Sequence, residues 1–325
     1  MKNILSIIGV VLLLAILAGL PFVIKNVSTI NLIIQIFMYV ILASAWNILG
    51  GYAGQISLGH AAYFGLGALL ARLLWINAGV HILPSILAGG LLAVVFALII
   101  GLPAFRLKGV YFTIGTLALA QILFVTVGNI WPYNSSFTPA EMRDFNELNK
   151  NIYRYYLFLV LVVSTVGTVF FLARSKLGLG MMAVKEEEDA AESLGVSALK
   201  HKIAALVLSA FFTGLAGGGF AYYFTSFYLN YTFSPIWSLD VLTMVFIGGQ
   251  GTILGPIIGA IFFVVLKEFL VLNLGEYHLL VFGVLFILVV LFLPGGIISA
   301  WKITQRAVTR RIKSGNSRTS LKKGS

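Results

Sequence analysis

The sequence has no cysteine and few charged residues. Of its 325 residues, 11 are Asp or Glu and 22 are Lys or Arg, so charged residues make up only 10%. Without cysteine the chain can form neither a disulfide framework nor a thiolate metal site or nucleophile. A soluble domain would have about 25% charged residues. The scarcity of charge therefore excludes an ordinary water-soluble protein.

Hydrophobic residues, at 59% of the chain, take the place of the missing charge. Apolar runs close to the ~20 residues that cross a bilayer recur along the whole length. The alternating pattern of an outer-membrane barrel is absent, and helices satisfy their own backbone groups in lipid. We predict an all-α, polytopic helical membrane protein with about 8–10 transmembrane segments. The apolar runs lie at about residues 4–24, 28–49, 60–78, 83–104, 110–131, 153–173, 203–225, 238–272 and 277–298.

The first run is longer than the core of a signal peptide, which has about 7–15 residues, so we expect it to stay as a transmembrane helix. The basic residues predict the orientation. One arrangement of the loops places 16 Lys and Arg inside and only Lys25, Arg143, Lys150 and Arg154 outside. By the positive-inside rule, both termini are then cytoplasmic.

The chain divides into a transmembrane domain at 1–300, with a cytoplasmic loop at about 174–202, and a basic cytoplasmic tail at 301–325. The tail carries eight Lys and Arg of a chain whose net charge is +11. It is either a solvated end or a segment that contacts anionic membrane lipids. Because its charge directly follows an apolar run, we expect no nucleic-acid partner.

Two glycine-rich stretches interrupt the apolar runs, one in each half of the chain. We expect the run 238–272 to form a short half-helix, a bend and a longer returning helix. Paired interruptions indicate a transport site within an inverted pseudo-repeat, because non-helical backbone is tolerated at membrane depth only where protein or a water-filled cavity covers it. The alternative is that the glycines only let helices pack closely. The residues assigned to the translocation path and its hinges are Gly50, Gly51, Tyr52, Gly54, Gln55, Ser57, Gly59, His60, Gly248, Gly249, Gly251 and Gly255.

Few ionisable side chains lie within the apolar runs. We expect His60 either to contact the solute or to satisfy a backbone group where a helix breaks. Arg72 would reach toward the outer interface, and Asp240 would cap the half-helix that follows it. Lys267 and Glu268 are adjacent, which suits a membrane interface better than a proton relay. The sequence contains no cluster with metal-ligand spacing and no catalytic dyad, so we predict neither a metal site nor an enzyme.

Residues Lys185 to Leu194, in the cytoplasmic loop, are predicted to form a short helix. Lys185 and Asp189 make an i,i+4 pair, and Gly195 is a natural stop. A helix of about ten residues is barely stable alone in water. The segment is therefore either a solvated connector or a helix held by something outside the membrane.

The stretch DAAESLG, Asp189 to Gly195, resembles the E-A-A-x-x-x-G loop of ABC importer permeases, with Asp in place of the first Glu. From about Leu32 to Pro294, five stretches in collinear order resemble the branched-chain amino-acid permease (LivH/LivM) family, and most closely its longer, LivM-like subunit. These stretches are GGYAGQISLGHAAYFGLGAL, AFRLKGVYFTIGTLAL, AVKEEEDAAESLGV, LSAFFTGLAGGGFAYY and VFIGGQGTILGPIIGA. In that family the loop docks onto an ATPase subunit. The resemblance thus implies ATPase coupling for Glu188, Asp189, Ala190, Ala191 and Gly195.

The resemblance implies a permease subunit of an ATP-driven importer that moves branched-chain or related hydrophobic amino acids across the plasma (inner) membrane. Its expected partners are a second homologous permease, two ABC ATPase subunits and an extracytoplasmic solute-binding protein. Because no G-x-x-x-x-G-K-[ST] phosphate loop occurs in the chain, we expect no cofactor here and place ATP and Mg²⁺ on the ATPase subunits.

The sequence departs from the family at two places that bear on the solute. Gln121 stands where the family often has an acidic residue, and the stretch 129–145 lacks the family's glycine-rich segment. Related permeases carry urea or short amides, which stays an alternative. A secondary transporter driven by an ion gradient is an alternative from another class, although charges for a relay inside the membrane are sparse.

Overall fold

The fold is almost entirely helical. The computed structural model describes residues 2–24, 26–131, 133–136, 148–224, 226–292 and 295–299. Within these ranges seven helical spans are long and apolar enough to cross a membrane, which confirms the prediction of an all-α polytopic membrane protein. The elements are α1 (Lys2–Val23), α2 (Val27–Asn47), the π-helix η1 (Ile48–Tyr52), α3 (His60–Arg72), the π-helix η2 (Leu73–Asn77), α4 (Ile82–Ala104), α5 (Val110–Ile130), β1 (Asn134–Ser136), α7 (Leu148–Leu172), α8 (Lys176–Glu186), α9 (Glu188–Ser193), α10 (Ala198–Tyr223), β2 (Ser226–Tyr228), α11 (Leu229–Thr232), α12 (Ile236–Gly248), α13 (Leu254–Leu274), the 3₁₀-helix η3 (Gly275–Tyr277) and α14 (His278–Phe292).

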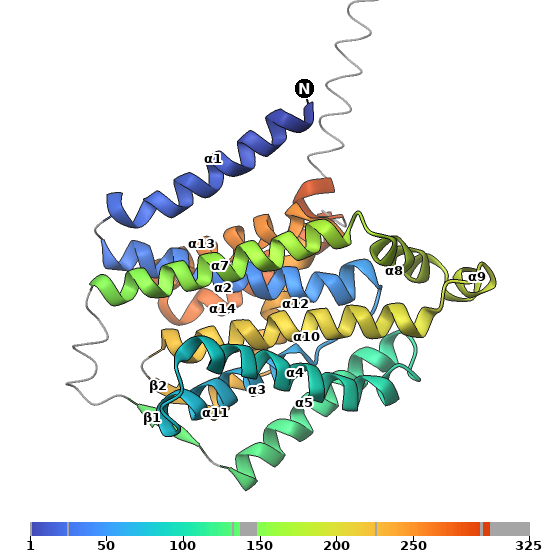
Figure 1. Cartoon of the computed structure of the whole chain (residues 1–325), viewed down its shortest axis with the longest axis horizontal. Coiled ribbons are helices and arrows are strands. Elements are labelled where there is room, and N and C mark those ends of the chain that lie inside the picture. The colour runs from blue at the N-terminus through green and yellow to red at the C-terminus, as the bar shows by residue number, and fades with distance from the viewer. Residues whose placement is uncertain are drawn as a thin grey trace, which may run out of the picture.

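The bundle has two distinct ends (Figure 1). The short helices α8 and α9 project at one end, and β1, β2 and α11 cover the other. The two strands pair antiparallel, with Asn134 opposite Tyr228 and Ser136 opposite Ser226. The loop that the positive-inside pattern assigns to the cytoplasm thus lies at the α8–α9 end. The cytoplasmic orientation of both termini stays a prediction, and the tail 301–325 lies outside the described residues.

Glycines allow the closest helix contacts in the core, where α10 packs against α3 and α4. A Cβ added at Gly67 of α3 would lie 2.6 Å from the Cα of Gly214 in α10, and one added at Gly214 would lie 2.9 Å from the Cα of Gly90 in α4. A Cβ at Gly217 would lie 2.9 Å from the carbonyl carbon of Phe64. Small residues let helix backbones approach in this way inside membranes. For these glycines, close packing is a sufficient explanation.

Helix α1 is hydrogen-bonded to α7 near Pro21, which interrupts the hydrogen bonds within α1. Pro21 has no N–H, so the carbonyl of Leu17, one turn earlier, loses its helical donor. The hydroxyl of Tyr155 in α7 donates to this carbonyl at 2.7 Å, and the hydroxyl of Tyr156 donates to Ala18 at 2.7 Å. Tyr155 and Tyr156 therefore bond the backbone of α1 one turn before its proline.

Arg72 does extend toward the strand end of the bundle, but it does not reach water there. Its side chain is buried, with 1% of the residue exposed. Its Nε donates to the hydroxyl of Ser135 in β1, and an Nη donates to the carbonyl of Ala221 in α10, both at 2.9 Å. Because the protein supplies these acceptors, the guanidinium has no need to reach water. Arg72 instead fastens the strand end of the bundle to α3.

Replacing Gly217 with Leu should destabilise the fold, because the new side chain would press on the backbone of α3 rather than on a flexible side chain. Overpacking of this kind costs about 1–3 kcal/mol or more. The matched control is Gly167→Leu in α7, where an added Cβ meets nothing within 4 Å. Thermal unfolding in detergent measures the difference. Equal melting temperatures for the two variants would contradict the packing described here.

Candidate translocation and coupling site

The two glycine interruptions meet in space. The side-chain amide of Asn47, the last residue of α2, donates to the carbonyl of Thr252 at 2.9 Å and accepts from the backbone N–H of Gly251 at 2.8 Å. In return, the amide of Gln250 donates to the carbonyl of Gly50 at 2.7 Å. We call these five residues the clasp. It joins segments about 200 positions apart in the sequence.

Glycine is required at the clasp for two physical reasons. Gly251 and Gly249 have φ of 74° and 125°, in the region that L side chains rarely adopt. The space between the segments is also too small for a Cβ: one added at Gly51 would lie 2.8 Å from the backbone nitrogen of Gly251. Next to the clasp, a Cβ at Gly248 would lie 3.0 Å from the nitrogen of Gly259, so α12 and α13 cross almost in contact. The predicted half-helix, bend and returning helix are thus confirmed.

The stretch between η1 and α3, residues 53–59, is not helical, and side chains of neighbouring helices supply its hydrogen bonds. The indole of Trp46 donates to the carbonyl of Ser57 at 2.8 Å. On the other side, the hydroxyl of Thr113 in α5 donates to Ile56, and Thr116 accepts from the N–H of Leu58. This internal satisfaction is what permits irregular backbone within a membrane protein.

His60 begins α3 and is buried, with 3% of the residue exposed. Its Nε2 lies 2.7 Å from the hydroxyl of Ser209 in α10. The next residue, Ala61, donates its N–H to the hydroxyl of Ser238 in α12 at 2.9 Å. The beginning of α3 is therefore fixed to two other helices. Of the two roles proposed for His60, its burial favours the structural one over direct contact with the solute.

The predicted path and hinge residues are brought together, but most of them face protein. In the first interruption Gly54 and Gln55 are partly exposed, and in the second Gly251 is. Whether solute passes here stays a prediction. The remaining predicted positions are buried: Gly50, Gly51, Tyr52, Ser57, Gly59, His60, Gly248, Gly249 and Gly255.

The loop that the sequence analysis assigns to the cytoplasm forms two helices where one was predicted. The backbone is extended at Glu187 (φ −155°, ψ 108°), so α8 ends at Glu186 and α9 begins at Glu188. The i,i+4 pair of Lys185 with Asp189 is therefore absent. Helix α8 also begins earlier than predicted, with Ser175 as its N-cap. The stop at Gly195 is confirmed, with φ of 85°.

Helix α9 is held on the protein by one buried contact and one ion pair. Ala191 is buried against Val184 and Ala198, and Glu188 pairs with Lys202 at 2.6 Å. Its other side faces outward: Asp189, Ala190 and Glu192 are exposed, as is Leu194, at 85%. Leu194 thus places an apolar side chain among carboxylates on the outward side of α9.

The end of α8 lies directly on the clasp, through a residue that sequence reasoning missed. A Cβ added at Gly54 would lie 2.8 Å from the Cγ of Lys185, and one added at Gly251 would lie 3.4 Å from its Nζ. Lys185 thus contacts both interruptions at once. Nothing in its sequence surroundings indicates this. Asn47, also missed, had a signal: an amide at the end of an apolar run, just before a glycine pair.

These features define a polytopic helical membrane protein whose two glycine-rich interruptions lie against each other. The family of the branched-chain amino acid transport system permease component matches residues 28–290, and the chain belongs to that family.

Its relatives are LivM proteins. The chain is 28% identical to the high-affinity branched-chain amino acid transport system permease protein LivM of Escherichia coli K12, over 89% of this chain and 74% of the relative. The corresponding protein of Salmonella typhimurium is 27% identical over 88% and 73%. A probable LivM of Methanocaldococcus jannaschii is 25% identical over 88% and 98%. No solved structure matches the chain.

Replacing Asn47 with Leu should open the clasp, because Gly251 N–H and Thr252 C=O would both lose their partner inside the protein. Each buried group left unsatisfied costs about 1–3 kcal/mol. We expect a lower melting temperature and loss of uptake. The control is Asn273→Leu in α13, whose exposed amide donates to Phe269 of its own helix. A variant at Asn47 that is as stable as the control would refute the role given to the clasp.

Proposed function

We propose that the chain is the membrane-spanning subunit of an ATP-driven importer and translocates branched-chain or related hydrophobic amino acids. The observation that carries the proposal is the family match over residues 28–290, which contains the clasp, α8 and α9. The three relatives are named as branched-chain amino acid permeases over their shared length. The departures at Gln121 and at 129–145, part of which lies outside the described residues, keep urea or short amides as the alternative solutes.

The proposed assembly supplies what the chain lacks. Without a phosphate loop in the sequence, ATP and Mg²⁺ would be bound by two ATPase subunits, one of them against the exposed side of α9. A second homologous permease would complete the membrane part, and a solute-binding protein would deliver the amino acid at the strand end. No chemical step occurs on this chain, which acts as a mechanical transport subunit and not as an enzyme.

The coupling route follows the contacts from α9 to the clasp. A push on α9 would move α8, with which it shares the extended joint at Glu187. Lys185 at the end of α8 would then press on Gly54 and Gly251 together. Because both interruptions consist of backbone held by side-chain hydrogen bonds, they can hinge without breaking a regular helix. The helices on either side would turn about them and open or close the path.

The transport reaction itself can be tested in energised cells that express the whole transporter. We expect accumulation of radiolabelled leucine that persists when the proton gradient is collapsed and ATP is maintained. Accumulation that stops with the gradient would favour the ion-coupled alternative. Accumulation of urea or a short amide, but not of leucine, would move the solute to the other branch of the family.

Changing Leu194 to Asp should release the ATPase subunit, because a charge would replace the exposed apolar side chain of the coupling surface. We expect loss of the ATPase in an affinity pull-down and of leucine uptake, with unchanged thermal stability. Leu194 is a cleaner target than Ala191, which is buried. The control is Leu83→Asp, 52% exposed in the first turn of α4 at the strand end. If both variants retain the ATPase equally, α9 is not the docking segment.

A further inference from the structure

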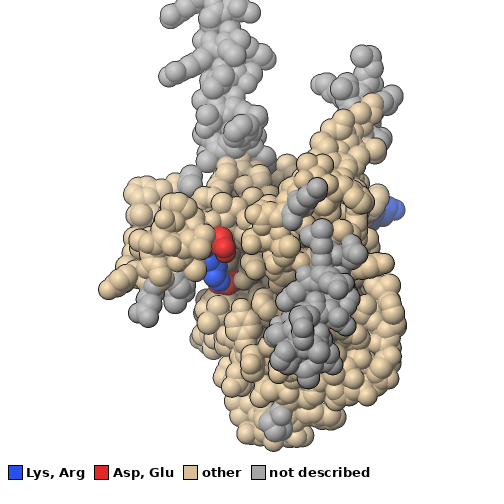
Figure 2. All heavy atoms as spheres, turned by 90° about the vertical axis from the view of Figure 1, so that its left-hand side faces the viewer, with Lys and Arg blue, Asp and Glu red and all other residues tan. Residues whose placement is uncertain are grey.

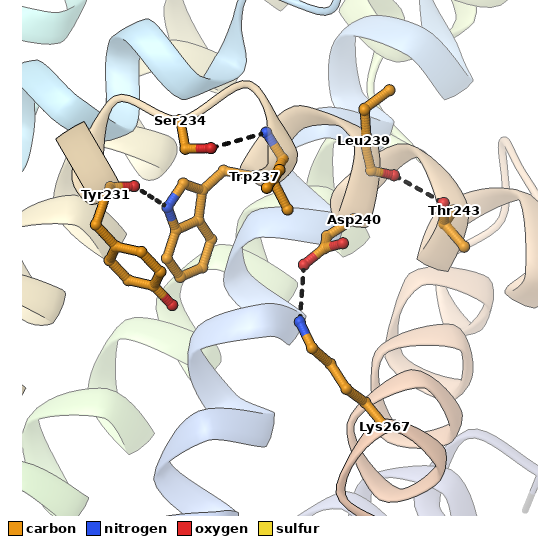
Figure 3. Close-up of polar contacts among 8 residues, drawn as sticks. Tyr231, Ser234, Trp237, Leu239, Asp240, Thr243 and Lys267 are labelled. Carbon is orange, nitrogen blue, oxygen red and sulfur yellow. Dashed lines mark hydrogen bonds and ion pairs between the residues drawn. The ribbon is translucent and has the colours of Figure 1, made fainter. Parts of the chain in front are cut away.

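A pocket of about 160 Å³ lies at the strand end of the bundle, between α2, α12 and α13. It lies away from the clasp, at the middle of α2, the beginning of α12 and the second half of α13. Aromatic rings and charged groups share its wall, which includes Gln35, Tyr39, Tyr231, Trp237, Lys267 and Glu268. Trp237 is fixed in place, since its indole donates to the carbonyl of Tyr231 at 3.0 Å (Figure 3).

The charges at this pocket are of both signs. Lys267 of α13 reaches Asp240 of α12, with 3.3 Å between Nζ and Oδ2 (Figure 3). The expectation that Asp240 caps α12 is wrong, because the helix begins at Ile236, one turn before Asp240. Glu268 stands beside Lys267 and is exposed. Seen from the strand side, a small group of acidic and basic atoms lies in a recess of a largely uncharged surface (Figure 2).

Stability alone does not account for these three groups. Ionisable side chains within a membrane span are expensive and mark functional positions. The pair of Asp240 with Lys267 is longer than a typical charge-assisted hydrogen bond of about 2.7–2.9 Å, whereas that of Glu188 with Lys202 measures 2.6 Å. The Lys267 side chain is 37% exposed, and partly exposed pairs stabilise little. Its ammonium is thus open to a second anionic partner.

We propose that this pocket binds a zwitterionic α-amino acid with an apolar side chain. The ligand's carboxylate would pair with Lys267, and its ammonium with Glu268. The apolar side chain would lie against Tyr39 and Trp237. A pocket with aromatic rings and a few convergent charges suits such a ligand. Neither an apolar solute nor urea carries a charge that could pair with Lys267 or Glu268. This inference rests on the proposed function and adds to it an entry site at the strand end.

The test is equilibrium binding of radiolabelled leucine to the purified transporter in nanodiscs, without the solute-binding protein. Two competitors each lack one charge: leucinamide has no carboxylate, and 4-methylpentanoate has no ammonium. We expect leucine to compete about tenfold better than either. Leucine that binds no better than both analogues would overturn the proposal.

Variants assign the charges to residues. In Lys267→Met, leucine affinity should fall about tenfold and leucinamide should compete as well as leucine. In Glu268→Gln, 4-methylpentanoate should become the equal of leucine. Lys108→Met, an exposed lysine between α4 and α5, should leave binding unchanged. The double variant Asp240→Asn with Lys267→Met removes both members of the ion pair, so neither is left without its partner, and it carries the test if the single variant fails to fold.

The leucine-binding measurements distinguish a purely structural role of the Asp240–Lys267 pair from a role in binding the ligand. If the pair only holds α12 to α13, the double variant keeps full leucine affinity, and the proposal is wrong. If cells take up leucine but the purified transporter shows no binding that depends on Lys267, the entry site fails and the transport function stands. If cells take up another solute and not leucine, the transport function itself fails.

Discussion

The N–H and C=O groups of the two interruptions have lost their helical partners, and lipid offers none in exchange. In this chain the interruptions supply one another. The amide of Asn47 serves a donor and an acceptor of the second interruption, and Gln250 serves a carbonyl of the first. Each interruption therefore takes part of its hydrogen bonding from the other. This mutual dependence fixes the relative positions of α2, α12 and α13, which between them carry the clasp at one end and the charged pocket at the other.

The same constraint explains the residues around the clasp. Hydroxyl groups of α5 and the indole of Trp46 complete the hydrogen bonds of residues 53–59, and Ser238 of α12 serves the first turn of α3. Regular helices would need none of these side chains. These side chains allow the backbone to leave the helical conformation at the interruptions. Lys185 of α8 contacts both interruptions. Helix α8 is thus in direct contact with both interruptions of the transmembrane helices.

Glycine has two separate uses in this fold. Between α3, α4 and α10 it brings three helices into backbone contact, and those positions have ordinary helical geometry. At the clasp it also supplies backbone angles that other residues avoid, at Gly249 and Gly251. Close packing accounts for the first set, and the second set shapes the interruptions, whose role in the translocation path stays a prediction. The two uses are distinguished by the φ angle of the glycine and by the atoms that lie opposite it.

The sequence by itself determined the helical membrane class, the approximate span positions, the half-helix that returns after Gly248 and the stop at Gly195. Each follows from local physics: apolar length, the conformational freedom of glycine, or the missing N–H of proline. The tertiary structure decided the burial of Arg72, the partner of Asp240, the joint at Glu187, and the roles of Asn47 and Lys185. These depend on groups brought close from far along the chain, and a polar side chain in a membrane takes whichever partner the fold presents. The residues near such a side chain in the sequence do not indicate its partner, so the partner is known only from the folded structure.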